Sequence, residues 1–241
     1  MRVQIRSRVT ELFPAVHFRA ALTLAAALAV VSVEQVGQAA TTGRIAGVVH
    51  VSTRSGAPLR PGAYPSRRVT KAAGETSEVS NVVVFIADAP RDAALPAMRA
   101  SIAQRDESFV PRVVAVTRNS TVEFPNFDPF FHDVFSLSRN ATFDLGRYPK
   151  GQTRERRFTQ PGIVKVFCNI HSDMSAIVMV FDHRYFAIPA ADGTFELDSV
   201  PAGTWHLNAW HERIGSTSRS LQVVAGGTTR VEFTVPVIDE R

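Results

Sequence analysis

Short apolar runs, separated by turn-forming residues, extend through most of this chain. Residues 79–88 (VSNVVVFIAD) are rich in β-branched side chains, which favour strands. The segment 176–182 (AIVMVFD) is apolar up to its last residue, which predicts an interior strand buried on both faces. At 118–120 two alternating segments meet, and Asn119 can adopt the left-handed conformation that glycine usually supplies. Strands and turns at this density predict an all-β protein, either a sandwich or a barrel.

The amino-acid composition of the chain changes near residue 183. Asp192-Gly193, Ala202-Gly203 and Gly226-Gly227 are predicted tight turns between strands. A segment of about 55 residues with four or five strands is marginal as an independent fold. It is therefore predicted to be a small second β-domain that packs on the first.

The N-terminus has a different pattern. Four arginines precede the apolar run from Ala20 to Val33, and small residues follow it. The run is too short to span a bilayer comfortably, whereas the basic start and small-residue end fit a secretory signal with cleavage after Ala39. A retained membrane anchor is the alternative. The predicted organisation is a signal peptide at 1–39, a first domain at 40–182 with its core at 79–182, and a second domain at 183–241.

The net charge and the cysteine content limit the classes of function that this chain can have. The formal net charge of +5 is mild and not clustered as in nucleic-acid-binding proteins. Export predicts a periplasmic or other oxidising compartment, yet Cys168 is the single cysteine and can form no disulfide within the chain. No nucleophile–base pair or paired carboxylates form a convincing motif, which argues against a hydrolase and for a protein that is not an enzyme.

Cys168 has potential metal ligands close to it. It ends the alternating segment IVKVFC, and His171 and Met174 follow at intervals of three residues. His132 begins another predicted strand, which a sandwich could place beside this loop. Two imidazoles, one thiolate and a weak thioether are the ligand set of a mononuclear blue-copper site, whereas zinc has no use for thioether sulfur. The alternative for Cys168 is a buried, inert thiol.

The chain from about Val79 to Asp182 resembles the cupredoxins, the small blue-copper proteins that include plastocyanin and amicyanin. The similarity lies in ESFVPRVVAVTRNSTVEFPNFDPFFHDVFS and in GIVKVFCNIHSDM, whose C-x-x-H-x-x-M spacing is typical of amicyanin. This resemblance implies a Greek-key β-sandwich that holds one type 1 copper ion and passes electrons through the edge of His171. The implied copper ligands are His132, Cys168, His171 and axial Met174.

Further residues are expected around such a site. Asn126 and Asp133 are candidates to brace the ligands; Asp133 stands where cupredoxins usually have asparagine, and its charge is expected to lower the reduction potential. The residues expected to face a partner protein are Phe130, Phe131, Arg154, Arg156 and Arg157. Arginines there would steer an acidic redox partner, such as a cytochrome or a dehydrogenase. No nucleic acid, and no membrane after signal cleavage, is expected as a partner.

The segment from about His183 to Val235 is similar to carboxypeptidase-regulatory-like and transthyretin-like β-modules through ADGTFELDSVPAGTWHLNAWHE. Three functions follow for the whole chain. The leading hypothesis is an exported type 1 copper protein that carries single electrons. Its two-domain layout resembles that of bacterial exported proteins described as plastocyanin-like or methylamine-utilisation proteins. The other two hypotheses are a periplasmic copper storage or delivery protein, and a non-redox envelope binding module with a carbohydrate-binding-like fold.

Overall fold

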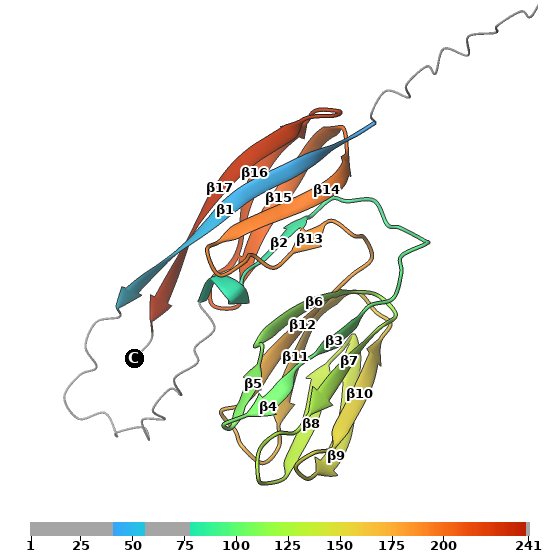
Figure 1. The fold of residues 1–241 in the computed structure, drawn as a ribbon, viewed down its shortest axis with the longest axis vertical. Coiled ribbons are helices and arrows are strands. Elements are labelled where there is room, and N and C mark those ends of the chain that lie inside the picture. The colour runs from blue at the N-terminus through green and yellow to red at the C-terminus, as the bar shows by residue number, and fades with distance from the viewer. Residues whose placement is uncertain (1–40, 56–77, 240–241) are drawn as a thin grey trace, which may run out of the picture. The chain divides into compact units, whose positions relative to one another are not determined.

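The computed structural model describes residues 41–55 and 78–239, and nearly all of the regular structure within these ranges is β (Figure 1). The predicted all-β class is therefore confirmed. The predicted signal peptide and its cleavage point lie outside the described residues. Within the described ranges, no helix is long and apolar enough to cross a membrane.

A first sandwich is formed by ten consecutive strands. These are β3 (Arg99–Ser101), β4 (Ala103–Arg105), β5 (Ser108–Val110), β6 (Val113–Thr117), β7 (Ser120–Pro125), β8 (His132–Ser138), β9 (Ala141–Tyr148), β10 (Thr153–Phe158), β11 (Gly162–Cys168) and β12 (Ser175–Phe181). The larger sheet has the order β6-β12-β11-β8-β9, the smaller one has the order β10-β7-β3, and β4 pairs with β5. Valine and phenylalanine side chains from the two larger sheets share one buried core.

Three details of the first sandwich follow directly from its sequence. The apolar part of the predicted segment 176–182 lies in β12, which is between β6 and β11 and is buried over almost its whole length, as predicted. Asn119 joins β6 to β7 with a φ of 67°, so it occupies the predicted left-handed turn position. The charged strand β10 lies at an edge of its sheet, where arginines discourage pairing with another chain.

A second sandwich contains the C-terminal strands together with two strands from the N-terminal part of the chain. Its elements are β1 (Thr42–Ser55), the 3₁₀ helix η1 (Glu78–Asn81), β2 (Val83–Ile86), β13 (Phe186–Ala187), β14 (Thr194–Pro201), β15 (Gly203–His211), β16 (Gly215–Val223) and β17 (Thr228–Asp239). Its two sheets have the orders β14-β1-β17 and β13-β2-β15-β16. Their facing apolar side chains form a core of their own.

This strand pairing corrects the expected allocation of residues 42–55 and 83–86 to the first domain, which was predicted to span 40–182. β1 pairs in parallel with β17 over twelve residues from Arg44 onward, and β2 pairs with β15. Strand β1 is the central strand of one sheet, between β14 and β17, and β2 lies between β13 and β15 in the other. The second sandwich is thus not a contiguous C-terminal unit, because strands on both sides of the first sandwich in sequence are needed to complete its sheets.

Candidate metal centre

The loop between β7 and β8 is held by the buried side chain of Asn126. Its amide nitrogen donates to the carbonyl oxygens of Phe130 (2.8 Å) and Tyr148 (3.1 Å), and its oxygen accepts the N–H of Asp128 (2.9 Å). These bonds fix both ends of the short loop that precedes His132, the first residue of β8. Asn126 thus fixes the backbone leading to a candidate ligand, in line with its expected role as a brace.

The second segment of the site is the turn from β11 to β12. Cys168 is the last residue of β11 and lies opposite Val134 of β8 in the antiparallel pairing. The backbone N–H of Met174 donates to the carbonyl oxygen of His171 (3.1 Å), and that of Cys168 donates to the carbonyl oxygen of Met174 (3.3 Å). The loop therefore folds back on itself and presents His171 on the side of His132.

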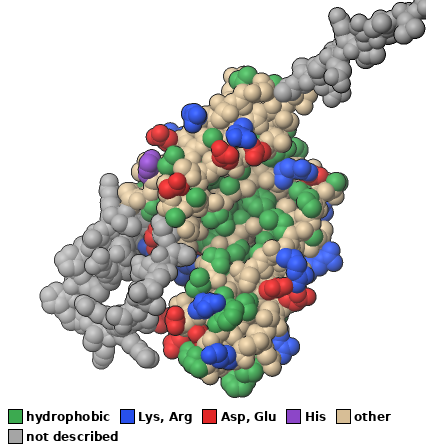
Figure 2. All heavy atoms as spheres, in the orientation of Figure 1, with side chains coloured by type: hydrophobic (Ala, Val, Ile, Leu, Met, Phe, Trp, Pro, Cys, Tyr) green, Lys and Arg blue, Asp and Glu red, His purple; other side chains and the backbone are tan. Residues whose placement is uncertain are grey.

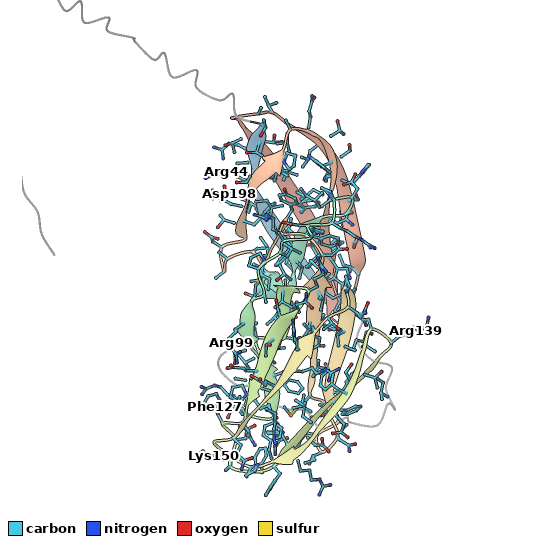
Figure 3. The ribbon with its side chains drawn as sticks, turned by 90° about the vertical axis from the view of Figure 1, so that its right-hand side faces the viewer. Arg44, Arg99, Phe127, Arg139, Lys150 and Asp198 are labelled. Carbon is cyan, nitrogen blue, oxygen red and sulfur yellow. The ribbon has the colours of Figure 1, made fainter. Side chains whose placement is uncertain are left out.

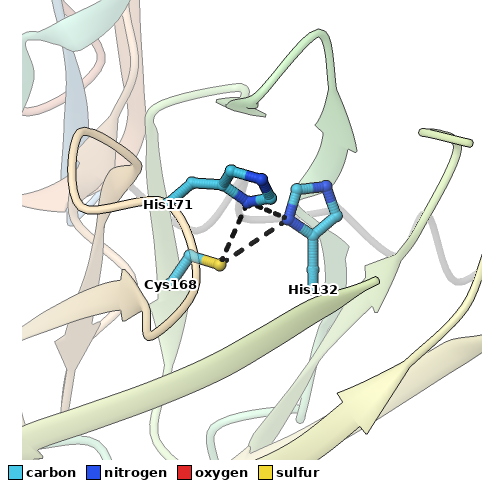
Figure 4. A group of neighbouring side chains, drawn as sticks. All are labelled: His132, Cys168 and His171. Atoms are coloured by element: carbon cyan, nitrogen blue, oxygen red, sulfur yellow. Dashed lines mark hydrogen bonds between the residues drawn. The ribbon is translucent and has the colours of Figure 1, made fainter. Parts of the chain in front are cut away.

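Side chains from these two segments converge on one point (Figure 4). The Nδ1 atoms of His132 and His171 are 3.2 Å apart, and Cys168 Sγ lies 3.6 Å from the first and 3.8 Å from the second. A triangle with these sides has a circumscribed radius of about 2.1 Å, so a point in its plane lies at metal–ligand bonding distance, roughly 2.0–2.3 Å, from all three atoms. The spacing of the three donor atoms therefore matches that of a metal site.

The four predicted ligands differ in exposure. The side chains of His132, Cys168 and Met174 are buried in the first sandwich, whereas His171 is partly exposed. His132, Cys168 and His171 form the group of metal-ligating side chains that the described part of the chain brings together. Met174 belongs to the same core cluster as Cys168, and its backbone is hydrogen-bonded to both Cys168 and His171; its axial role stays a prediction.

Asp133 joins β8 to the ligand loop. Its carbonyl oxygen accepts the backbone N–H of Asn169 (2.9 Å), and its carboxylate accepts the side-chain amide of the same residue (3.4 Å). Burial raises the pKa of Asp133, and the neighbouring carboxyl of Asp144 raises it further, while the Asn169 bond opposes both. Asp133 therefore contacts the ligand loop through its backbone and its carboxylate, beside a second acidic group, and its role as a brace stays a prediction.

An apolar surface adjoins the exposed edge of His171. The Phe130 ring packs against both imidazoles, with its centroid 5.3 Å from that of His132 and 5.1 Å from that of His171. Phe130, Phe131, Arg147, Ile170 and His171 line a hollow of about 360 Å³. Phe131 and Ile170 are exposed there. The two phenylalanines predicted to face a partner thus lie beside the candidate metal centre, and Arg147 is a basic residue at this hollow.

The three predicted arginines of β10 are all exposed but lie at different distances along the strand from this end. Arg154 pairs with Phe124 near the start of the loop, whereas Arg157 pairs with Thr121 toward the opposite end of β7. Arg154 also lies 5.9 Å from the ring centre of Tyr148. Figure 3 shows Phe127 and Lys150 toward the lower end of the first sandwich, with Arg99 higher on it. Arg154 is therefore the member of the three nearest the candidate site by register.

One residue at the site has no counterpart among the sequence-based candidates. The carboxylate of Asp128 lies 2.8 Å from Nε2 of His132 and is almost fully buried. The spacing D-x-x-x-H within DPFFH was the available signal. This spacing alone did not predict the contact, because the conformation of the loop decides whether the Asp128 side chain points toward His132.

Solved cupredoxins are similar to this chain. The purple cupredoxin from Nitrosopumilus maritimus is 21% identical with a TM-score of 0.32, over 34% of this chain and 99% of its own. Amicyanin from Paracoccus versutus is 19% identical with a TM-score of 0.33, over 41% of this chain and 97% of its own. A copper-containing nitrite reductase from Thermus scotoductus is 27% identical with a TM-score of 0.34, over 39% of this chain but only 24% of the enzyme.

The sequence matches no family model and no curated protein. Because the structural overlap is partial and distant, the case for a metal site rests on the side chains themselves. Two imidazole nitrogens and one sulfur suit copper, since imidazole binds both of its oxidation states and thiolate favours Cu(I). His132, Cys168 and His171 fit a copper ion by donor type and by spacing.

Proposed function

We propose that this chain is an exported copper protein that carries single electrons between partner proteins and is not itself an enzyme. The observation that supports this proposal is the triangle of Cys168 Sγ and the two Nδ1 atoms, whose three sides are between 3.2 and 3.8 Å. A bound copper ion would supply the one-electron Cu(II)/Cu(I) couple. Three donors already at bonding distance from one point favour rapid exchange, because little rearrangement would accompany the change of charge.

The protein side chains would have separate tasks. His132 and Cys168 would hold the ion beneath the surface, where Met174 and the surrounding core exclude water. His171 is partly exposed, so its ring would form the route by which an electron enters from one partner and leaves to another. Phe131 and Ile170 around it would make the close, largely apolar contact that electron transfer between proteins needs.

We infer that the redox partner is an acidic cytochrome or dehydrogenase. Arg147 at the hollow and Arg154 on β10 would attract it before contact. Figure 2 shows acidic and basic side chains interspersed on one face of the molecule, so steering would come from local groups and not from a uniformly positive surface. The association rate should fall as salt rises, because exposed charges are screened over about 8–10 Å at moderate ionic strength.

Copper binding is tested by adding Cu(II) to the purified protein and recording its visible spectrum. An intense thiolate-to-copper band is expected from the wild type and none from Cys168→Ser, which keeps the size of the side chain but removes the sulfur. A folded wild-type protein with a reduced thiol and no such band would refute the proposal.

Electron transfer is then separated from copper storage or delivery by voltammetry and by metal release. A reversible potential with slow release to a chelator is expected of an electron carrier. Ready release without a reversible potential would favour delivery. Partner capture that is unchanged in Cys168→Ser would instead support an envelope binding module.

A further inference from the structure

The imidazole of His132 is held from behind by a buried carboxylate. Its Nδ1 atom faces Cys168 and His171, and its Nε2 atom lies 2.8 Å from Oδ2 of Asp128. His132 has no exposed surface, and Asp128 is only 5% exposed, so water does not compete for this bond. A ring that donates its Nε2–H leaves the Nδ1 lone pair free for a metal.

Asp128 is itself fixed by two other donors. Its Oδ1 atom accepts the backbone N–H of Asp106 (2.7 Å), and Oδ2 accepts that of Glu107 (3.1 Å). These two residues form the turn between β4 and β5, with φ angles of 50° and 54°. An ionised carboxylate only accepts hydrogen bonds, so the two backbone N–H groups suit it, and His132 Nε2 completes the set if it carries the ring proton. The position of the carboxylate is therefore set by the turn as well as by the histidine.

We propose that Asp128 is a positioning residue that sets both the tautomer and the donor strength of His132. The negative charge behind the ring increases the electron density at Nδ1, which stabilises Cu(II) more than Cu(I). Asp128 thereby lowers the reduction potential of the site. The electronic part of this inference rests on the proposed copper function, whereas the tautomer of His132 is a property of the copper-free protein.

A purely structural role for Asp128 predicts a different result. If the carboxylate served only to hold the β4–β5 turn, its loss would lower the stability of the first sandwich without changing the protonated nitrogen of His132 or the potential. The two roles are separated by Asp128→Asn, which keeps the size of the side chain and an oxygen acceptor but removes the charge. Asp173→Asn is the matched control, since Asp173 is an exposed carboxylate in the ligand loop.

The first measurement is the ¹⁵N and ¹H NMR spectrum of the histidine side chains in the copper-free protein. In the wild type we expect the His132 proton on Nε2, with the downfield proton shift of a strong bond to a carboxylate. In Asp128→Asn this signal should move upfield or be lost. A wild-type proton on Nδ1 would overturn the proposal, and this result does not depend on whether the variant folds.

The second measurement is the affinity for Cu(II) and Cu(I) together with the midpoint potential. Loss of such an outer partner typically weakens metal binding about 10- to 100-fold, and here the loss should fall mainly on Cu(II). Each tenfold difference between the two affinities raises the midpoint potential by ~59 mV. An unchanged potential in Asp128→Asn, or an equal shift in Asp173→Asn, would overturn the electronic role. Failure of the wild type to bind copper would refute the proposed function instead, and the NMR result would still decide the tautomer.

Discussion

Gly47 offers a direct test of how β1 is placed in the second sandwich. A Cβ atom on this residue would lie 2.2 Å from the carbonyl oxygen of Val231 in β17 and 2.8 Å from the ring of Phe195 in β14. Both neighbours belong to the strands that pair with β1. The substitution Gly47→Ala therefore forces a backbone carbonyl and a buried aromatic ring to move.

The size of the effect follows from these contacts. Extra methyl groups in packed interiors cost about 1–3 kcal/mol, and a clash with backbone on one side and a buried ring on the other belongs at the upper end, about 3 kcal/mol. For a chain of this length each kcal/mol lowers the melting temperature by about 2–4 °C, so a fall of roughly 6–12 °C is expected. Gly227→Ala is the matched control, because its nearest neighbour would be the Val224 oxygen at 3.4 Å, an ordinary contact.

The chain contains its own probes for this experiment. Both tryptophans, Trp205 and Trp210, lie on β15 of the second sandwich, and Cys168 is the only thiol and lies in the first. Unfolding in denaturant is followed by tryptophan fluorescence and by the rate of thiol labelling. The fluorescence midpoint should fall in Gly47→Ala and stay nearly constant in Gly227→Ala. A midpoint unchanged in Gly47→Ala, or lowered equally in both, would refute the pairing of β1 with β17 and β14.

Three further predictions concern the metal site and pH. His171→Gly should lose the visible copper band and regain it when imidazole is added, because position 171 is partly exposed to solvent. His132→Gly should not regain the band, because position 132 is buried. Rescue of both variants would contradict this difference in burial. Copper at 100 times its dissociation constant should stabilise the wild type by ~2.7 kcal/mol in thermal unfolding, and Cys168→Ser should show no such gain. Burial lowers the pKa of His183 and of His211 below the usual value near 6.5, so the unfolded chain takes up protons first and the free energy of unfolding should fall as pH drops below about 6.5. In denaturant titrations at pH 7.5 and pH 5, His183→Asn should reduce that fall, and an unchanged dependence would show that His183 does not contribute.

The ligand loop was the most predictable part of the site. Cys168, His171 and Met174 occupy one short turn, so their spacing alone limits how far apart they can lie. His132 is different, because 36 residues separate it from Cys168. Its place beside the cysteine depends on the pairing of β8 with β11 in the larger sheet, which a sequence pattern can suggest but cannot fix.

The division into sandwiches was predictable only in part. Alternating and apolar runs identified most strands, since side-chain period and burial are local properties of the sequence. They did not show that β1 and β2 complete the second sandwich. The partners of a strand depend on which hydrophobic faces meet. Strand β1 (42–55) pairs with β17 (228–239), although almost the whole chain separates them in sequence.

The amino-acid sequence by itself determined the all-β class, the ligand types and the short ligand loop, because each of these depends on neighbouring residues. Only the tertiary structure decided three features. These are the 3.2 Å distance between the Nδ1 atoms of His132 and His171, the pairing of β1 with β17, and the position of the Asp128 carboxylate behind His132. These features join residues through sheet pairing and loop conformation. They arise from the packing of the whole chain, which no local pattern specifies.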